Sequence, residues 1–331
     1  MSRVYFAKLN KSCKKEICNA SEKLIKSITK ETRLEKEIPL KVHFGEDGND
    51  TYIKPENYEG LINFFNRNGI SSKFMETNVL YKGRRTTSDE HKKLALEHGF
   101  NQLPIVISEK HQKIKVNLKH FKKCKIGKEF TKYKQILVIS HFKGHYLSGF
   151  GGAIKQLGMG FATRAGKNDM HSSSRPILNP FKCKKCGVCA KNCPKDAVET
   201  KRFIPRIKKN CIGCAACIAV CPNNAIVVNW IFGLGKSFNE RLVEYAFAAQ
   251  KNRENIYFNF LINITRGCDC VGSKMKTISP DIGVLASFDP VAIDKASLEL
   301  VKKHKKFFGE YTLEYCESIG LGSRSYRLIE V

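Results

Sequence analysis

The residues with the clearest capacity for chemistry are the fourteen cysteines of this 331-residue chain. Eight of them form two runs with the same spacing, C-x2-C-x2-C-x3-C-P, which cover residues 183–194 and 211–222. Dense cysteines in an intracellular chain indicate metal or redox ligands, because disulfides are disfavoured there. Zinc sites need neither a fourth cysteine followed by proline nor a repeat of the whole run. The pattern therefore predicts two [4Fe–4S] clusters.

Each run supplies three closely spaced thiolates for one cubane, and its fourth thiolate reaches the other cubane. We therefore predict that one cluster is held by Cys183, Cys186, Cys189 and Cys221. The second cluster is predicted to be held by Cys193, Cys211, Cys214 and Cys217. Residues 181–230 resemble bacterial two-cluster ferredoxins, and this resemblance implies electron transfer between the clusters. A structural role without redox function is the alternative.

Six cysteines lie outside these runs. Cys268 and Cys270 are one residue apart and follow a predicted strand, so both side chains should project to the same side at a strand end. We predict an additional metal site or a reactive thiol site there, with two packed thiols as the alternative. No motif surrounds the remaining cysteines, which we expect to be ordinary buried thiols: Cys13, Cys18, Cys124 and Cys316.

Apolar runs and helical periodicity alternate along the rest of the chain. The predicted strands are residues 4–9, 39–44, 74–80, 103–107, 135–140, 257–265 and 282–287. The predicted helices are residues 14–29, 58–66, 91–97, 239–249 and 290–302, the last with Asp289 as its N-cap. This order predicts an α/β fold with a mostly parallel sheet.

The cysteine block interrupts the α/β pattern, which resumes after it. We therefore predict an inserted ferredoxin-like 2[4Fe–4S] module. In this division residues 1–175 form the first part of the α/β domain, residues 176–230 the ferredoxin-type domain, and residues 231–331 the completing part.

A glycine-rich stretch before the cysteines suggests a pocket for an anion. Backbone N–H groups at Gly149, Gly151 and Gly152 could approach a ligand closely. Arg84 and Arg85 could clamp a carboxylate or phosphate with two hydrogen bonds each. Ordinary tight turns and solvated side chains are the alternative.

Several stretches carry a family resemblance over nearly the whole chain. They are residues 41–49, 78–85, 141–145, 149–155, 268–270 and 281–294. Together they resemble the family catalogued as domain of unknown function 362, with its inserted ferredoxin domain. The resemblance implies an iron–sulfur protein on an α/β scaffold and no agreed reaction.

A more distant resemblance concerns His145, Lys155 and His171, which are candidate catalytic residues. Their spacings of ten and sixteen residues are similar to those in nickel-pincer lactate racemases. In that family the lysine joins the pincer cofactor, the later histidine ligates nickel, and the earlier histidine is an acid/base. The chain departs from the pattern upstream, where residues 82–85 replace a further catalytic histidine. The resemblance therefore implies a shared pocket rather than racemisation.

The formal net charge is +27, which two clusters at −2 each would lower to about +23. Such a charge favours acidic partners, although general lysine richness is an alternative explanation. No run of about 18 apolar residues is present, and residues 1–11 lack the apolar core of a signal peptide. We therefore predict a cytoplasmic protein without a membrane span.

Two functions remain open at this point. The first is an iron–sulfur redox protein whose clusters pass electrons to or from a site in the α/β domain, with an oxidoreductase acting on a small anionic substrate as the candidate enzyme class. The second is an electron-transfer or maturation subunit that docks a redox partner, acidic in character, and has no chemistry of its own. Nucleic-acid binding is disfavoured, and no dinucleotide fingerprint is present.

Overall fold

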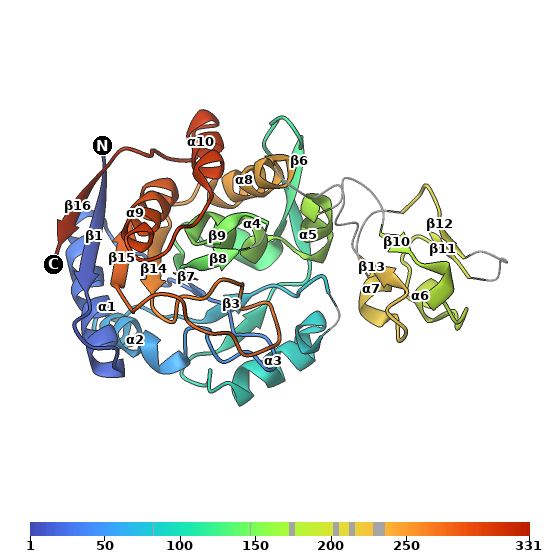
Figure 1. The fold of residues 1–331 in the computed structure, drawn as a ribbon, viewed down its shortest axis with the longest axis horizontal. Coiled ribbons are helices and arrows are strands. Elements are labelled where there is room, and N and C mark those ends of the chain that lie inside the picture. The colour runs from blue at the N-terminus through green and yellow to red at the C-terminus, as the bar shows by residue number, and fades with distance from the viewer. Residues whose placement is uncertain (82, 146, 172–175, 201–204, 212–215, 228–235) are drawn as a thin grey trace.

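The computed structural model describes residues 1–81, 83–145, 147–171, 176–200, 205–211, 216–227 and 236–331 (Figure 1). At its centre lies an eight-stranded sheet with the strand order β16-β1-β15-β14-β7-β2-β3-β4. The strands are β1 (Ser2–Lys8), β2 (Leu40–Lys41), β3 (Phe74–Glu76), β4 (Ile105–Ile107), β7 (Leu137–His141), β14 (Ile256–Leu261), β15 (Gly283–Ser287) and β16 (Tyr326–Glu330).

Most neighbouring strands in this sheet are parallel. The run from β14 through β7, β2 and β3 to β4 is parallel throughout, and β1 is parallel to β16. Only β15 runs against its neighbours, β1 and β14. The predicted α/β fold with a mostly parallel sheet is therefore confirmed.

Helices cover both faces of the sheet (Figure 1). One face carries α1 (Lys14–Ile28), α2 (Glu59–Arg67) and α3 (Ser88–Glu97). The other carries α4 (Ala153–Phe161), α5 (Arg164–His171), α8 (Lys236–Gln250), α9 (Pro290–Lys302) and α10 (Glu310–Ser318). In the described part of the chain, no helix is both long and apolar enough to cross a bilayer.

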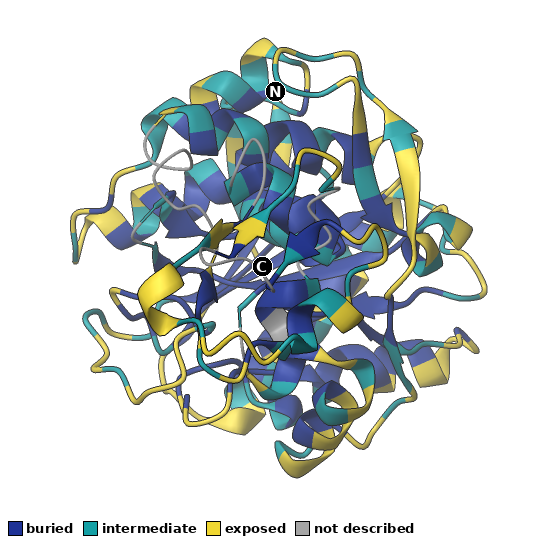
Figure 2. Ribbon diagram, turned by 90° about the vertical axis from the view of Figure 1, so that its right-hand side faces the viewer, coloured by how far each residue is buried: buried dark blue, intermediate teal, exposed yellow. Residues whose placement is uncertain are grey.

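Two apolar cores separate along the sheet because successive strand residues point to opposite faces. In β1, Val4 and Phe6 join the core under α8 and α9, whereas Tyr5 and Ala7 join the core under α1 and α2. Buried residues accordingly gather in the central strands, and exposed ones gather in the peripheral loops (Figure 2).

One predicted helix begins and ends at the expected residues, whereas two predicted strands are shorter than expected. The helix predicted at residues 290–302 is α9, and the Asp289 carboxylate accepts hydrogen bonds from the N–H groups of Val291 (2.8 Å) and Ala292 (3.0 Å). The predicted strands at 39–44 and 74–80 are shorter in the structure and end at Lys41 and Glu76. Beyond those ends the chain turns toward a cavity described below.

Other elements had no clear sequence signal. They are the hairpin of β5 (His111–Lys115) and β6 (Lys123–Gly127), helices α4, α5 and α10, and strand β16. Helix α4 was not predicted because its glycines are more typical of turns. They serve helix packing instead, since a Cβ on Gly158 would lie 2.5 Å from the carbonyl oxygen of Leu242 in α8. The glycine lets the two helix backbones approach closely.

The described residues among 176–227 form what we call the cysteine-rich lobe, which lies beside the α/β body near α5 (Figure 1). Its elements are β10 (Ile177–Leu178), α6 (Val188–Lys191), β11 (Val198–Glu199), β12 (Arg206–Ile207), α7 (Ala216–Val220) and β13 (Ile226–Val227). Strand β10 pairs with β13, and β11 pairs with β12, both antiparallel. These short elements place the two cysteine runs side by side.

Candidate functional site

A cavity of about 300 Å³ opens where parallel strands of the large sheet end. His141 is the last residue of β7, Glu76 is the last residue of β3, and His43 follows β2 by two residues. All three line the cavity. Ligand sites of α/β sheets usually lie at the carboxyl ends of the strands, and the volume suits a small molecule.

One wall of the cavity is built around Arg85, which is 1% exposed. Its guanidinium contacts Glu76 (2.8 Å), the ring nitrogen of His91 (3.0 Å) and that of His43 (2.9 Å). Burial alone would raise the pKa of Glu76, but Lys41 at 2.7 Å and Arg85 outweigh it and lower that pKa. Arg85 thus lines the cavity as a fixed charge, and not as the free two-pronged clamp that the sequence predicted.

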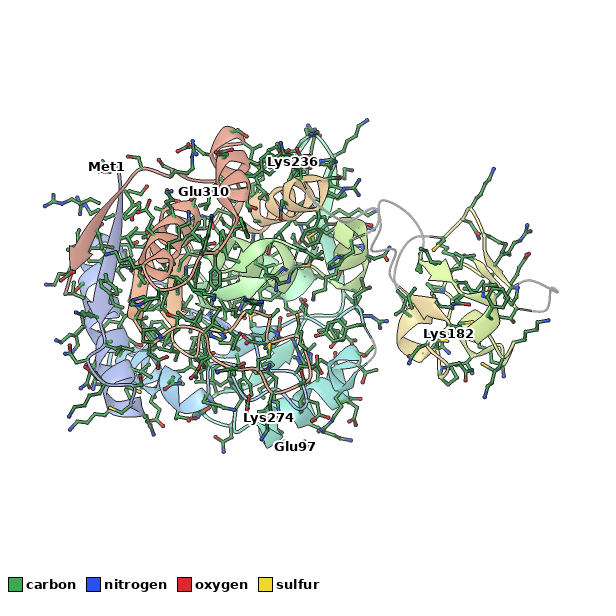
Figure 3. The ribbon with its side chains drawn as sticks, in the orientation of Figure 1. Met1, Glu97, Lys182, Lys236, Lys274 and Glu310 are labelled. Atoms are coloured by element: carbon green, nitrogen blue, oxygen red, sulfur yellow. The ribbon has the colours of Figure 1, made fainter. Side chains whose placement is uncertain are left out.

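Arg84 does not line the cavity at all. Its guanidinium donates two hydrogen bonds, of 2.5 and 2.6 Å, to the carboxylate of Glu97. Glu97 lies at the lower surface of the molecule in Figure 3. The expected ligand-binding role of Arg84 is therefore not supported by its position, because consecutive residues of this short turn face opposite ways.

The opposite wall comprises the hairpin of β8 (Lys143–His145) and β9 (Gly149–Gly151), followed by α4. Gly151 and Gly152 line the cavity, as expected. Gly149 does not. It has φ of +81°, and a Cβ there would lie 2.2 Å from the carbonyl oxygen of Phe308. Gly149 therefore serves the turn and its packing.

The backbone N–H groups at the N-terminus of α4 already bind a carboxylate of the protein itself. The carboxylate of Asp294 accepts the N–H groups of Ala153 (2.7 Å) and Ile154 (2.9 Å). A Cβ on Gly152 would lie 2.3 Å from that carboxylate. These two N–H groups hold Asp294 and are not presented to a ligand, whereas the prediction for the N–H groups of Gly151 and Gly152 stays a prediction.

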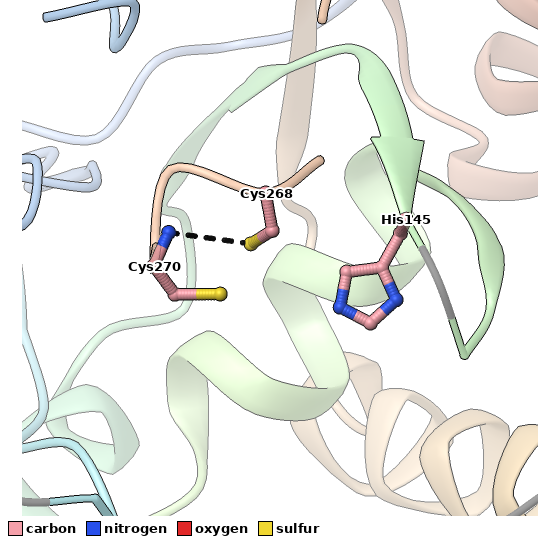
Figure 4. A group of neighbouring side chains, drawn as sticks. All are labelled: His145, Cys268 and Cys270. Carbon is pink, nitrogen blue, oxygen red and sulfur yellow. Dashed lines mark hydrogen bonds between the residues drawn. The ribbon is translucent and has the colours of Figure 1, made fainter. Parts of the chain in front are cut away.

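The three candidate catalytic residues do meet at the cavity, together with two cysteines from a distant loop. His145, Lys155, His171, Cys268 and Cys270 all line it. Side-chain donor atoms of His145, Cys268 and Cys270 lie within 4.8 Å of one another (Figure 4), and this trio could hold a metal ion. It is the one such group in the described ranges. The Lys155 Nζ lies 3.2 Å from Cys268 Sγ.

Burial and mutual charge set the protonation states of this group. The hydrogen bond with Cys270 lowers the pKa of Cys268, and the positive charge of Lys155 lowers it further. The same hydrogen bond, together with burial, raises the pKa of Cys270. Burial alone would lower the pKa of Lys155, but the adjacent cysteine sulfurs outweigh burial and raise it. Burial, with Lys155 nearby, lowers the pKa of His145, and it lowers that of His171 to about 3. At neutral pH Lys155 is therefore an ammonium and the two imidazoles are neutral, and the shifts favour the thiolate form of Cys268 over that of Cys270.

A ring stack closes the side of the cavity nearest the cysteine-rich lobe. The imidazole of His171 stacks on Phe238 of α8, with ring centroids 5.0 Å apart and planes at 25°. Both residues line the cavity. His171 is therefore fixed by packing at the end of α5, where the chain leaves the α/β body.

Sequence reasoning missed the buried ion network next to these residues. The Asp269 carboxylate contacts His141 Nδ1 (3.0 Å) and the Lys143 ammonium (2.6 Å). Lys167 donates to Thr77 Oγ1 (2.5 Å) and to the Asn78 carbonyl (2.8 Å), and burial lowers its pKa to about 7. A signal was available, because charged residues end or follow several predicted apolar strands.

The cavity lining carries an excess of positive groups. The lining includes Arg85, Lys143, Lys155 and Lys167, whereas Glu76 is the one carboxylate among its described members. A buried charge is stable only where an opposite charge or strong hydrogen bonds compensate it. Glu76, Asp269 and Cys268 already compensate Arg85, Lys143 and Lys155, so an anionic ligand would add to existing pairs rather than supply the first opposite charge.

The cysteine-rich lobe contains a small hollow whose lining includes Cys183, Cys186, Cys189 and Cys221. Three of these come from the first run, and the fourth comes from the second run. This is the set expected for one crossed [4Fe–4S] site, so the donors fit the group. The residues of the second predicted set are less completely placed: Cys193 and Cys217 pack in the apolar cluster of the lobe, Cys211 is half-buried, and Cys214 lies outside the described residues.

The fourth cysteine of each run has the same local environment. The N–H of Ala197 donates to Cys193 Sγ (3.1 Å), and the N–H of Ala225 donates to Cys221 Sγ (3.2 Å). Both donors are four residues beyond their cysteine. Amide hydrogen bonds to cluster sulfurs tune the potentials of iron–sulfur proteins, and the two contacts described here are of that kind.

Leu80 connects the two sites. It is 3% exposed, it lines the cavity of the α/β body, and it packs in the same apolar cluster as Cys189, Cys217 and Cys221. One side chain therefore touches both the predicted cluster domain and the predicted substrate cavity.

The four cysteines without a motif differ in exposure. Cys124 and Cys316 are fully buried, as predicted. Cys18 is half-buried, and Cys13 is exposed just before α1, so the prediction of a buried thiol was wrong for Cys13. Its position on the surface side of the first helical turn explains the difference.

Residues 38–299 match the family model described as Domain of unknown function (DUF362). The chain belongs to this family. The matched span of this DUF362 protein includes the cavity residues, from His43 to Val271, and the whole cysteine-rich lobe. The family's description names no reaction, and no curated protein matches the chain.

Two solved structures are similar to the DUF362 protein at low identity. One is a protein from Thermotoga maritima, with 12% identity and a TM-score of 0.43, covering 92% of this chain and 59% of that one. The other is the lactate racemase apoprotein from Thermoanaerobacterium thermosaccharolyticum, with 12% identity and a TM-score of 0.46, covering 93% of this chain and 58% of that one. The chain thus spans less than two thirds of the length of either protein.

Proposed function

We propose that the protein is an iron–sulfur redox protein in which two [4Fe–4S] clusters exchange electrons with a substrate site in the α/β domain. One cluster is assigned to Cys183, Cys186, Cys189 and Cys221, and the other to Cys193, Cys211, Cys214 and Cys217. The module spans residues 176–230, between α/β parts at 1–175 and 231–331. When bound, such clusters supply one-electron transfer.

One observation carries this proposal: a single hollow is lined by three cysteines of the first run and the last cysteine of the second. Two independent zinc sites would each draw on nearby ligands of one run. The matching N–H···S contacts at Cys193 and Cys221 support the same crossed assignment. Leu80 supports electron exchange with the cavity, because it packs in both places.

The substrate assigned to the cavity is a small anion, which makes the protein a candidate oxidoreductase. Lys155 and Lys143 supply the charge that attracts a carboxylate or phosphate. Burial lowers the pKa values of His145 and His171, so both imidazoles are neutral and add polar groups to the lining without adding charge.

Paired substitutions test the crossed ligation in anaerobically purified protein. The double variant C183A/C221A removes two ligands of one cluster, and it should retain the other cluster with about four iron atoms. The matched variant C183A/C193A removes one ligand from each cluster and should lose both. Iron, acid-labile sulfide and the electron paramagnetic resonance of the reduced protein are measured together.

The opposite ranking of the two variants would mean that each run holds its own cluster. Zinc in place of iron in the unsubstituted protein would overturn the proposal altogether. Binding of small carboxylates and phosphate is measured by calorimetry on the same protein, with Lys155→Gln expected to weaken binding. Arg84→Gln is the control, since Arg84 pairs with Glu97 outside the cavity.

A second function, an electron-transfer subunit that docks a partner, is favoured by the surface of the lobe. Phe181 is 97% exposed, and it lies beside exposed Lys182, Lys184 and Lys185 and near Cys186, which is also exposed (Figure 3). A basic surface with an apolar centre suits an acidic redox protein. The rate at which a small acidic ferredoxin reduces the protein should fall in the K184E/K185E variant, and the remaining rate should no longer depend on salt. Lys113→Glu on β5 is the control and should keep the wild-type rate.

A further inference from the structure

Two sulfur atoms on the cavity wall stand close together without a defined role. Cys268 and Cys270 line the cavity, and their Sγ atoms lie within the 4.8 Å that also includes His145 (Figure 4). Neither belongs to the two cluster-binding runs. The loop that carries them lines the same cavity as Lys155.

Cys268 Sγ is surrounded by hydrogen-bond donors. Lys155 Nζ lies at 3.2 Å, the backbone N–H of Cys270 points to the sulfur at 3.5 Å, and His145 shares a hydrogen bond with it. Donors of this kind stabilise a thiolate, and a thiolate is the form of cysteine that reacts. Cys270 is the nearest partner for such a reaction.

The orientation of His145 argues against a metal at this place. A histidine that binds a metal usually donates its other ring N–H to an acceptor. Here Nδ1 of His145 instead faces two donors, the backbone N–H groups of Ser148 (3.1 Å) and Leu147 (3.3 Å). Nδ1 is therefore an acceptor, and the ring proton resides on Nε2, where a metal ion would have to bind.

The backbone between the two cysteines is firmly held. Asp269 is fully buried, with its carboxylate bound by Lys143 (2.6 Å) and His141 (3.0 Å). Beyond Cys270, the carbonyl of Val271 accepts a hydrogen bond from Asn49. These contacts hold the loop in place while the two sulfur atoms lie within 4.8 Å of each other.

We propose that Cys268 and Cys270 are a redox-active dithiol that exchanges two electrons at the cavity wall. In the oxidation, the Cys268 thiolate and the Cys270 thiol form one S–S bond, and one proton and two electrons are released. The two electrons go to a reducible group of a molecule bound in the cavity, and two iron–sulfur clusters would return them to the disulfide one at a time. In this respect the inference rests on the proposed function. In the reverse direction the S–S bond breaks, and the same proton returns to Cys270.

This arrangement would give the cavity a two-electron reagent. Iron–sulfur clusters transfer single electrons, whereas the reduction of most organic groups needs a pair. A dithiol beside a cationic cavity could reduce a disulfide or another two-electron acceptor that carries an anionic group. The substrate class is therefore a small anion with a reducible bond.

The sequence offers a clean test by mass spectrometry. Arg266 and Lys274 bound a tryptic peptide, residues 267–274, whose only cysteines are Cys268 and Cys270. Anaerobic holoprotein is equilibrated with mixtures of reduced and oxidised dithiothreitol, quenched in acid, unfolded and alkylated. We expect both thiols of the peptide to lose alkylation together, with a mass two hydrogens lower, along a two-electron Nernst curve.

The controls are internal and matched. Residues 307–324 form a tryptic peptide with Cys316 alone, and this buried thiol should stay alkylated at every potential. Cys270→Ser should leave Cys268 alkylated throughout. Circular dichroism verifies that the variant is folded.

Independent alkylation of the two thiols over the whole range would overturn the inference. So would full alkylation of both thiols at every potential together with one additional metal ion per chain in the folded protein, which would make the trio a metal site. Iron and sulfide are determined on the same sample. If a cluster is missing but the dithiol titrates as expected, the proposed function is wrong and the dithiol inference stands. If both clusters are present but the two thiols do not titrate together, only the dithiol inference is wrong.

Discussion

The cysteine-rich lobe and the cavity of the α/β body hold reactive side chains in different ways. In the lobe, the strands are two residues long, and much of the apolar cluster is made of the cysteines themselves. In the body, the reactive groups are attached to a long sheet with an apolar core on each face. Buried ion pairs such as Lys143–Asp269 then fix their orientation.

The difference teaches which site depends on its cofactor. Small domains without a large core usually need metals or disulfides for stability. The lobe meets this description, whereas the cavity is preorganised by packing and ion pairs whether or not a ligand is bound. The two regions should therefore respond separately to metal removal, to charge deletion and to pH.

Removal of iron should have the largest effect and should be confined to the lobe. Chelation under anaerobic conditions is expected to unfold residues 176–227, because three of the buried side chains there are the ligands Cys189, Cys217 and Cys221. Hydrogen exchange should rise across the lobe and stay unchanged in α4 and α9. Equal loss of protection in both regions would break the comparison.

Asp269→Asn should destabilise the body by roughly 3–5 kcal/mol, because it leaves the buried charges of Lys143 and His141 without their carboxylate. Chemical denaturation measures the change in the free energy of unfolding. Hydrogen exchange of α4 and β7 shows whether the change lies in the body. The matched control is Asp50→Asn at an exposed position, which should leave stability nearly unchanged. A small effect at Asp269 would mean that the cavity is less preorganised than described.

Leu80→Ala should weaken the connection between the two regions by about 2 kcal/mol, the lower end for a buried leucine, since the lobe can partly close the space. We expect faster hydrogen exchange in β10 and β13 and slower electron exchange with the cavity. Val79→Ala is the control, because Val79 lines the cavity without joining the lobe's apolar cluster. Identical effects of both variants would remove the special role of Leu80.

Lys167 should give an effect that depends on pH and is small within any one pH unit. Its pKa in the folded protein is lowered to about 7, while an unfolded lysine keeps its proton to about 10.4. Between these values the unfolded chain binds more protons, so stability should rise with pH by up to about 1.4 kcal/mol per unit. Lys167→Met should lose this slope when unfolding is compared at pH 7 and pH 9. An unchanged slope would show that Lys167 is not deprotonated on folding.

The two regions also differ in how far their sequences predict them. The ligands of the lobe could be assigned from spacing, because loop geometry ties neighbouring cysteines to one cluster. The helix at Pro290 was equally clear, since its cap and its proline are local signals. Helix α4 was not, because Gly158 and Gly160 lower helix propensity and their packing role depends on partners far away in the chain.

Within the cavity, residues with local spacing were found and those joined by the sheet were missed. His145, Lys155 and His171 lie within one continuous stretch. Lys143 and Asp269 are 126 residues apart and meet only because β7 and β14 are neighbours. Local spacing failed for Arg84 and Arg85, which are adjacent but point in opposite directions. Arg84 pairs with Glu97 and Arg85 with Glu76, and the positions of these carboxylates depend on the fold.

The stack of His171 on Phe238 has a consequence for how this protein could change over evolution. The two rings stand where the chain leaves the body and where it comes back, so they join the base of the whole inserted segment. The entropic cost of closing a loop grows only with the logarithm of its length, by about 0.6 kcal/mol for each doubling. The body could therefore accept a longer, shorter or entirely different segment between the same two rings without rebuilding its cavity.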